Sequence, residues 1–107
     1  MPNLEVVAII SPKPRKQARV EQLLLEVSAH AKENEPDTLR YQVHRQIKKD
    51  TPEFVVIETY TGKAGLEKHA SSDIYKRLGK AIQSEDLLVK PLQVVAMHPI
   101  GGFASRL

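Results

Sequence analysis

The first apolar run of the chain is LEVVAII at residues 4–10, where apolar and mostly β-branched side chains occupy both alternating positions. Such side chains favour strands, and a strand that is apolar on both faces is typical of the centre of a sheet. The turn SPKP follows, and Pro14 suits the first turn of a helix, where the missing N–H costs nothing. The pattern predicts a central strand, a turn and then a helix.

The apolar positions after this turn recur with a helical period. They fall at i, i+3, i+4, i+7 and i+11, at Val20, Leu23, Leu24, Val27 and Ala31. Charged residues occupy the opposite side, as in an amphipathic helix that packs on a core. Glu35-Pro36-Asp37 ends the pattern, because the residue before a proline is displaced from helical geometry.

Two alternating segments come next. TLRYQVHRQI at 38–47 places Leu39, Tyr41 and Val43 on one face, and FVVIETYT at 54–61 returns after the polar loop KKDTPE. Alternation with a period of two on either side of a short polar loop predicts a β-hairpin.

The remainder of the chain predicts helix and then strand. Gly62 and Gly65 bracket a break, after which a short helix carries Leu66, His69 and Ala70. Ser72 is a plausible N-cap for a second helical piece. That piece has Ile74, Tyr75, Leu78 and Ile82 at helical spacing. KPLQVVAMHP at 90–99 forms the last predicted strand.

The predicted order is β-α-β-β-α-β. With right-handed crossovers, this order gives an α+β ferredoxin-like fold, a four-stranded antiparallel sheet with its helices on one face. We expect a single domain over residues 1–107, in which residues 99–107 form a C-terminal tail.

The strands predict a homodimer, because two helices cover only one face of such a sheet. The second face would carry Val7, Ile9, Val55, Ile57, Val95 and Met97. A face exposed to water would instead alternate apolar with polar residues, and an apolar patch of this kind requires a cover. A second copy packed face to face supplies that cover with two-fold symmetry.

Composition narrows the classes of function. The 16 basic and 13 acidic side chains give a net charge of +3 and are scattered, and aromatic residues make up only 5%. A nucleic-acid binder more often shows a basic stripe with interleaved aromatics. The chain has no cysteine, which excludes disulfides and thiol catalysis. With no long apolar run and no signal-peptide pattern, we expect a soluble cytoplasmic protein that binds neither nucleic acid nor membrane.

The common motifs of metal, phosphate and serine-hydrolase sites are missing from the sequence. The four histidines are dispersed without a pair of ligands on one helix face, so no metal site is expected. The glycines form no phosphate-binding loop, and no G-x-S-x-G elbow occurs.

Glu58 lies in an apolar strand, on one face with Phe54 and Tyr60. Burying a carboxylate there is costly unless it is paired or its pKa rises. Two interpretations stay open. Glu58 is either a structural residue bonded to Arg40, Arg45 or a backbone amide, or a polar group that lines a cavity between sheet and helices.

His69 falls at the edge of its helix's apolar stripe. It is either a satisfied histidine between core and surface or a proton acceptor that faces an apolar space. Tyr41, Tyr60 and Tyr75 are first of all core residues whose buried hydroxyls need partners. His30 lies near the end of the first helix, where the helix dipole favours a cation, so we interpret it as structural.

Three segments together resemble the antibiotic biosynthesis monooxygenase (ABM) family: VEQLLLEV, EPDTLRYQVHR and FVVIETYTGKAGLEKHASSDIYKRL. The resemblance covers roughly residues 4–98. The family pattern runs E-P-G-x-x-x-Y, then F-x-x-x-E-x-W, then a helix with a central histidine and an S-x-x-F segment. The matching residues here are Glu35, Pro36, Tyr41, Phe54, Glu58, Tyr60, His69, Ser72 and Tyr75. Asp37 replaces the usual glycine, and Tyr60 replaces the usual tryptophan.

The resemblance implies a homodimeric α+β barrel. Some members are cofactor-free monooxygenases of quinols, anthrones and related aromatic polyketides, whereas others degrade haem, isomerise small signals or have no established activity. Haem degradation is disfavoured, because the iron-binding histidine of those members would fall near Gly79.

The function that the resemblance favours is a cofactor-independent monooxygenase that uses O₂ on a small lipophilic aromatic, quinol or polyketide-like substrate. His69 would be the proton acceptor or a substrate hydrogen-bond partner, and Glu58 its electrostatic partner or a second acceptor. Substrate contacts would come from Tyr41, Tyr60, Tyr75 and Leu78. No metal or flavin is required. The alternative is a homodimer of the same fold that binds a small ligand or acts as a scaffold without catalysis.

Overall fold

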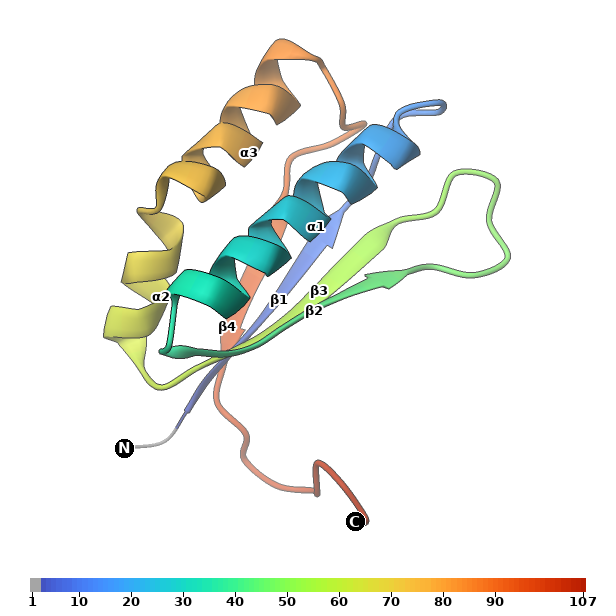
Figure 1. The fold of residues 1–107 in the computed structure, drawn as a ribbon. Coiled ribbons are helices and arrows are strands. Elements are labelled where there is room, and N and C mark those ends of the chain that lie inside the picture. The colour runs from blue at the N-terminus through green and yellow to red at the C-terminus, as the bar shows by residue number, and fades with distance from the viewer. Residues whose placement is uncertain (1–2) are drawn as a thin grey trace.

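The computed structural model describes residues 3–107, which form one four-stranded antiparallel sheet with three helices against one face (Figure 1). The elements in chain order are β1 (Leu4–Ile10), α1 (Gln17–Asn34), β2 (Thr38–Arg45), β3 (Phe54–Tyr60), α2 (Lys63–Ala70), α3 (Asp73–Ser84) and β4 (Gln93–Met97). The strand order is β2-β3-β1-β4. The ferredoxin-like prediction is confirmed, with the second helical region divided into α2 and α3.

Ser72 divides the two helices as predicted. Its side chain accepts a hydrogen bond from the backbone N–H of Tyr75, which caps the N-terminus of α3. A cap of this kind satisfies one of the N–H groups that the first helical turn leaves unpaired.

The start of α1 differs from the prediction. The helix begins at Gln17, and Pro14 lies in a turn before it, next to Arg15 with a left-handed φ of 71°. The reason is that the segment after β1 still pairs with the start of the α3–β4 connection, through Lys13 N–H to the Leu87 carbonyl at 2.8 Å. The chain must leave this pairing before a helix can begin.

Three strand details also differ. β4 spans 93–97 rather than 90–99, because only five residues of β1 pair with it, from Glu5 to Ile9. β2 ends at Arg45 rather than at 47. Leu39 is 54% exposed rather than on the face of Tyr41, because the register shifts between Thr38 and Arg40.

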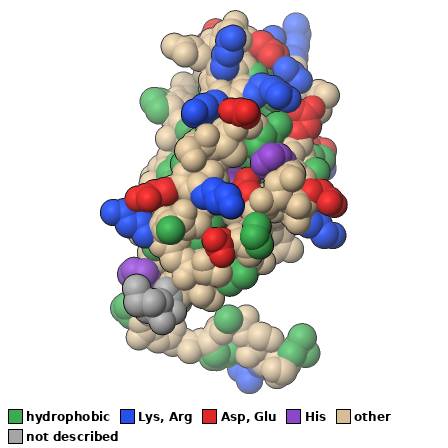
Figure 2. Space-filling view, turned by 60° about the vertical axis from the view of Figure 1, so that its left-hand side comes forward, with side chains coloured by type: hydrophobic (Ala, Val, Ile, Leu, Met, Phe, Trp, Pro, Cys, Tyr) green, Lys and Arg blue, Asp and Glu red, His purple; other side chains and the backbone are tan. Residues whose placement is uncertain are grey.

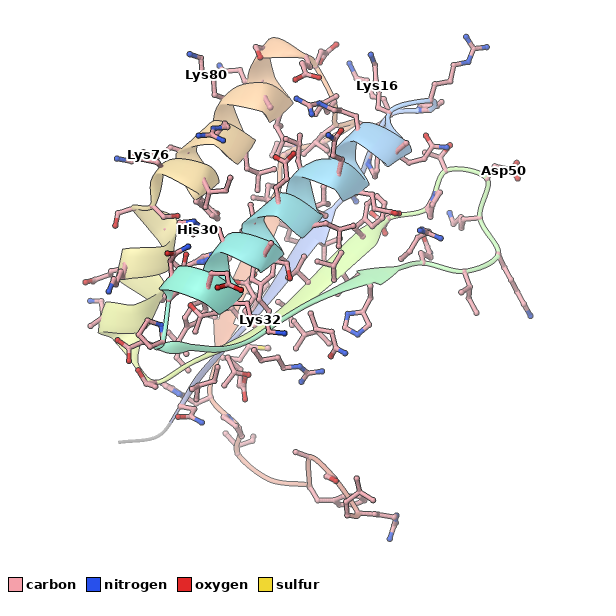
Figure 3. The ribbon with its side chains drawn as sticks, viewed as in Figure 1. Lys16, His30, Lys32, Asp50, Lys76 and Lys80 are labelled. Atoms are coloured by element: carbon pink, nitrogen blue, oxygen red, sulfur yellow. The ribbon has the colours of Figure 1, made fainter. Side chains whose placement is uncertain are left out.

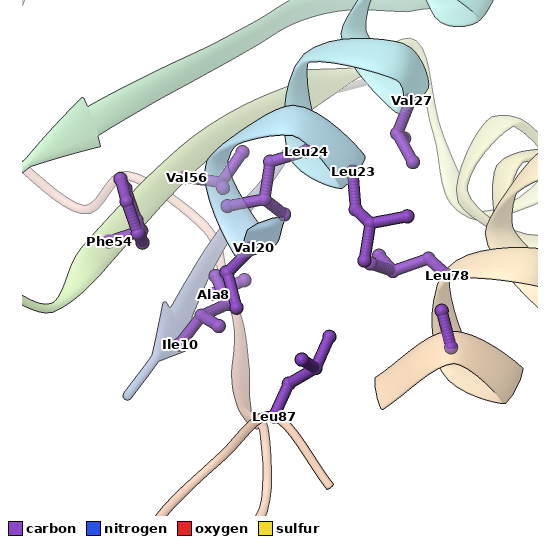
Figure 4. Close-up of a cluster of buried hydrophobic side chains, with 11 residues drawn as sticks. Ala8, Ile10, Val20, Leu23, Leu24, Val27, Phe54, Val56, Leu78 and Leu87 are labelled. Carbon is purple, nitrogen blue, oxygen red and sulfur yellow. The ribbon is translucent and has the colours of Figure 1, made fainter. Parts of the chain in front are cut away.

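The core lies between α1, α3 and the central strands β1 and β3 (Figure 4). The predicted helical stripe of α1 is buried throughout. In the sheet, Ile10 pairs with Phe54 and Ala8 with Val56, and all four side chains are buried. The next pair along this face is Val6 with Glu58, so a carboxylate continues the apolar row.

The other face of the sheet carries no helix (Figure 1). Val7, Ile9, Val55 and Ile57 are only partly buried there, and Val95 on β4 is 42% exposed. Beyond β4 the tail extends away from the body of the chain. Its apolar side chains, Ile100, Phe103 and Leu107, are exposed. An apolar face and an apolar tail are thus both uncovered in the single chain.

Charges of both signs are interspersed on the surface seen in Figure 2, without a large area of one sign. Within residues 3–107, no helix combines the length and the apolar content needed to cross a membrane.

Candidate functional site

Glu58 lies in the middle of β3 on the helix-covered face, and only 6% of it is exposed. Its Oε1 accepts a hydrogen bond from the hydroxyl of Tyr60, two residues along the same strand and on the same face. Arg40 and Arg45 bond to other side chains instead. The interpretation of Glu58 as a partner of either arginine is therefore wrong.

Burial sets the protonation of the groups around Glu58. It raises the pKa of the Glu58 carboxyl, and the hydrogen bond from Tyr60 opposes this rise only in part. Burial first, and then the charge of Glu58, raise the pKa of the hydroxyls of Tyr41 and Tyr75, and the same causes raise that of Tyr60. The three tyrosines therefore remain protonated at neutral pH and act as hydrogen-bond donors.

His69 is buried in the last turn of α2 with 1% exposure, deeper than its place at the edge of the apolar stripe suggested. Its ring is surrounded by the rings of Tyr41, Tyr60 and Tyr75, with centroid distances of 5.3, 5.6 and 5.3 Å. The three tyrosines come from β2, β3 and α3, so three separate elements place the aromatic rings of the predicted site around one imidazole.

The carboxylate that bonds to His69 is Glu35, whose Oε1 lies 2.6 Å from Nδ1 of the imidazole. Glu35 is the C-cap residue of α1 and is 5% exposed. Its Oε1 also accepts a hydrogen bond of 2.9 Å from the hydroxyl of Thr38. Sequence reasoning used Glu35 only as a helix stop and a family match; the available signal was a glutamate at the junction of two buried elements.

Gly65 allows α2 to approach the segment that carries Glu35. A Cβ at position 65 would lie 3.0 Å from Cβ of Asp37, closer than side-chain atoms pack. The missing side chain lets the first turn of α2 lie against the start of β2, and His69 reaches Glu35 one turn later.

Two atoms of this arrangement are buried without a hydrogen-bond partner within the described chain: Nε2 of His69 and Oε2 of Glu35. Buried polar atoms are paired in the large majority of cases, so an unpaired one needs an explanation. An imidazole nitrogen without a partner at 1% exposure is a group available to a bound molecule.

A cavity adjoins these groups. It is lined by His69, Glu58, Tyr41, Tyr75 and Leu78, together with apolar side chains of all the elements around it. The volume of the cavity is about 40 Å³. Tyr60, which the sequence predicted to contact the substrate, is not one of the residues that line this cavity, and its hydroxyl bonds to Glu58 instead.

The comparison with protein families decides the classification. The model of the antibiotic biosynthesis monooxygenase family matches residues 4–81, about three quarters of the chain. The chain belongs to the ABM family. No match was found among curated proteins.

Solved structures agree with this assignment. A candidate antibiotic biosynthesis monooxygenase from Caulobacter crescentus is 26% identical, with a TM-score of 0.82 over 94% of this chain and 92% of the other. Proteins from Pseudomonas aeruginosa and Mycobacterium tuberculosis are each 22% identical and have TM-scores of 0.83 and 0.82. They cover 94% and 95% of this chain, and 97% and 99% of their own. At this identity the last two support the fold alone.

The ABM match ends at residue 81, so it includes Glu35, Glu58 and His69 but not β4 or the tail. In this ABM protein the wall of the cavity next to Val94 therefore lies outside the matched region. Across residues 3–107, His, Asp and Glu side chains nowhere gather in a group of three suited to a metal ion.

Proposed function

We propose that this ABM protein is a cofactor-independent monooxygenase that oxidises a small lipophilic aromatic, quinol or polyketide-like substrate with O₂. The observation that carries the proposal is the unpartnered Nε2 of a buried His69, beside an apolar cavity that Glu58 also lines. An apolar cavity with few convergent polar groups is the usual form of a small-molecule site.

In this proposal, Nε2 of His69 accepts a proton from the substrate. The resulting carbanion or enolate transfers an electron to O₂, and recombination forms a C–O bond to a peroxide. The imidazolium protonates the peroxide, and the neutral imidazole then takes the remaining C–H proton as the O–O bond breaks. The hydroxide that leaves accepts this proton from the imidazolium, so that a CH₂ group and O₂ give a C=O group and water. The protonated hydroxyls of Tyr41 and Tyr75 would hold the substrate oxygen, and Glu58 would be the electrostatic partner of His69 or a second acceptor.

The size of the cavity supports the alternative function. The volume of the cavity is about 40 Å³, whereas drug-sized ligands occupy pockets of roughly 300–1,000 Å³. A multi-ring substrate therefore requires α2 and α3 to move away from the sheet. A homodimer that binds a smaller ligand, or serves as a scaffold without turnover, requires no such movement.

We also propose that the chain forms a homodimer through the open face of its sheet, as members of this family typically do. The support is the row of partly exposed Val7, Ile9, Val55 and Ile57 with the uncovered apolar tail. Sedimentation at micromolar concentration tests it. A folded 12.0 kDa species without any dimer would contradict the proposal.

Oxygen uptake in the presence of a panel of quinols and anthrones tests the enzymatic proposal. We expect uptake above the buffer rate with at least one compound, and formation of the corresponding quinone. Saturable binding of these compounds without any uptake would favour the non-catalytic ligand binder.

A further inference from the structure

Glu35 contacts a different side chain with each of its carboxylate oxygens. Oε1 accepts from Thr38 and lies 2.6 Å from Nδ1 of His69. Oε2 lies 3.6 Å from Nε2 of His30, whose side chain is 35% exposed. Glu35 therefore stands between one imidazole at the cavity and another that reaches solvent.

The bond between Glu35 and His69 determines where the imidazole proton lies. A carboxylate only accepts hydrogen bonds, so the proton of this bond belongs to Nδ1 of His69. In the neutral ring the other nitrogen, Nε2, then carries a lone pair. That nitrogen is the buried one without a partner.

The neighbours of Glu35 leave this bond in place. The hydroxyl of Thr38 donates to the same Oε1, at 2.9 Å, and a carboxylate oxygen can accept two such bonds. On the solvent side, the amide nitrogen of Asn34 lies 3.3 Å from Nδ1 of His30 and donates to its carbonyl at 3.2 Å. His30 therefore accepts at Nδ1 and carries its proton on Nε2, toward Glu35. Figure 3 shows His30 on the side of α1 nearer to α2 and α3.

We propose that Glu35 is a positioning residue that holds His69 in the tautomer protonated on Nδ1, so that a basic Nε2 faces the cavity. The role in catalysis rests on the proposed monooxygenase function. A histidine with the opposite tautomer would present an N–H to the cavity and could not accept the substrate proton.

The position of Glu35 at the end of α1 restricts the movement of its carboxylate. It is the C-cap residue of α1, its own N–H bonds to the Ala31 carbonyl at 3.0 Å, and its side chain is 5% exposed. Because backbone and side chain are both fixed, the carboxylate has little freedom to release the imidazole.

The first test is the ¹⁵N spectrum of His69 in the whole protein, recorded at a pH where the ring is neutral. We expect the proton on Nδ1 in the wild type. In Glu35→Gln, whose amide donates as well as accepts, we expect the tautomer ratio to shift toward Nε2–H by about tenfold or more. Glu35→Asp, with a shorter carboxylate, should give an intermediate ratio.

Glu33→Gln is the matched control, because Glu33 is an exposed glutamate at the end of the same helix. It should leave the His69 spectrum unchanged. A wild-type ring protonated on Nε2 would overturn the proposal, and this measurement needs no folded variant. A ratio that stays the same in folded Glu35→Gln would overturn it too.

Kinetics with a substrate that the wild type turns over separates this proposal from the proposed function. Glu35→Gln should lower kcat by about 10²-fold with a smaller change in KM, and Glu33→Gln should change neither. Turnover that is unaffected by Glu35→Gln would overturn the positioning role of Glu35 and leave the proposed monooxygenase activity intact. Absence of wild-type turnover would contradict the proposed monooxygenase function, and the tautomer spectra would still decide whether Glu35 orients His69.

Discussion

Glu35 and Glu58 are two carboxylates buried to almost the same extent, 5% and 6% exposed, and their surroundings differ in kind. Glu35 lies at a junction of helix and strand, where Thr38 and His69 bond to it. Glu58 lies inside a strand, where the Tyr60 hydroxyl is its hydrogen-bond partner and burial raises its pKa. One environment holds an imidazole and the other raises the pKa of the carboxyl, so the position of each carboxylate in the fold, rather than its residue type, sets its surroundings.

The largest expected effect comes from removing the imidazole of His69, which Glu35 contacts. His69→Ala should lower kcat by about 10²–10⁴-fold, because the proton acceptor is lost. The control is His44→Ala, an exposed histidine on the edge strand β2. Oxygen uptake with a substrate of the wild type measures both. Full activity of a folded His69→Ala protein would remove His69 from the proposed mechanism and leave Glu58 as the acceptor.

Tyr60→Phe should destabilise the surroundings of Glu58 and leave those of Glu35 unchanged. The substitution removes the donor to Glu58 and leaves its carboxylate buried and unpaired, at a cost of about 1–3 kcal/mol in the free energy of unfolding at neutral pH. Urea unfolding measures this cost. The His69 tautomer, which depends on Glu35, should stay as in the wild type.

Tyr75→Phe is the matched control for this change, since within residues 3–107 the Tyr75 side chain makes no hydrogen bond that the substitution would break. An equal loss of stability in both variants would show that the loss of a tyrosine hydroxyl in general, not the bond to Glu58, accounts for the effect.

Gly65→Ala should disturb the contact between Glu35 and His69. The added Cβ would meet Asp37 at 3.0 Å and push α2 away from the end of α1, which lengthens the contact between Glu35 and His69. We expect a loss of about 1–3 kcal/mol, the usual range for overpacking. Gly79→Ala is the control, because nothing lies within 4 Å of a Cβ there, and it should stabilise α3 by about 1 kcal/mol. Equal melting temperatures for the two variants would contradict this account.

The smallest effect should appear as a pH dependence in Glu58→Gln. The folded pKa of Glu58 lies above its ordinary value of 4.5, so the folded state binds this proton more tightly than the unfolded state. The stability that this binding contributes is complete below the ordinary pKa and is lost as the pH rises through the raised one. Glu58→Gln cannot ionise and should gain stability relative to the wild type as the pH rises from about 4 to about 8.

Urea unfolding across this range, with Glu33→Gln as the exposed control, measures the difference. A constant difference between the wild type and Glu58→Gln at all pH values would show that Glu58 has an ordinary pKa in the folded protein.

The spacing of apolar residues along the chain was sufficient to predict most of the fold. The strand at 4–10 and the buried stripe of α1 follow from spacing alone, because burial of one face imposes that spacing. The misplaced helix start at Pro14 had a non-local cause, the pairing of Lys13 with Leu87 across the molecule. A proline signal carries no information about such a partner.

The residues around the cavity were predictable in type but not in pairing. Glu58 stood out because a carboxylate in an apolar strand is costly, and His69 because it followed in the next helix. The bond from Tyr60 to Glu58 joins neighbours on one face of β3, whereas the bond between Glu35 and His69, 34 positions apart, depends on how the elements pack. Nothing within a single element encodes that packing.

The contact between Gly65 and Asp37 has a consequence for how sequences of this family diverge. The family pattern has a glycine where this chain has Asp37, and the space on the two sides of the contact is shared. Side chains at both positions fit only if the contact widens by a few tenths of an ångström. We expect relatives that retain the glycine before β2 to accept alanine at the position of Gly65 more readily, so that the two sites change together as a compensating pair.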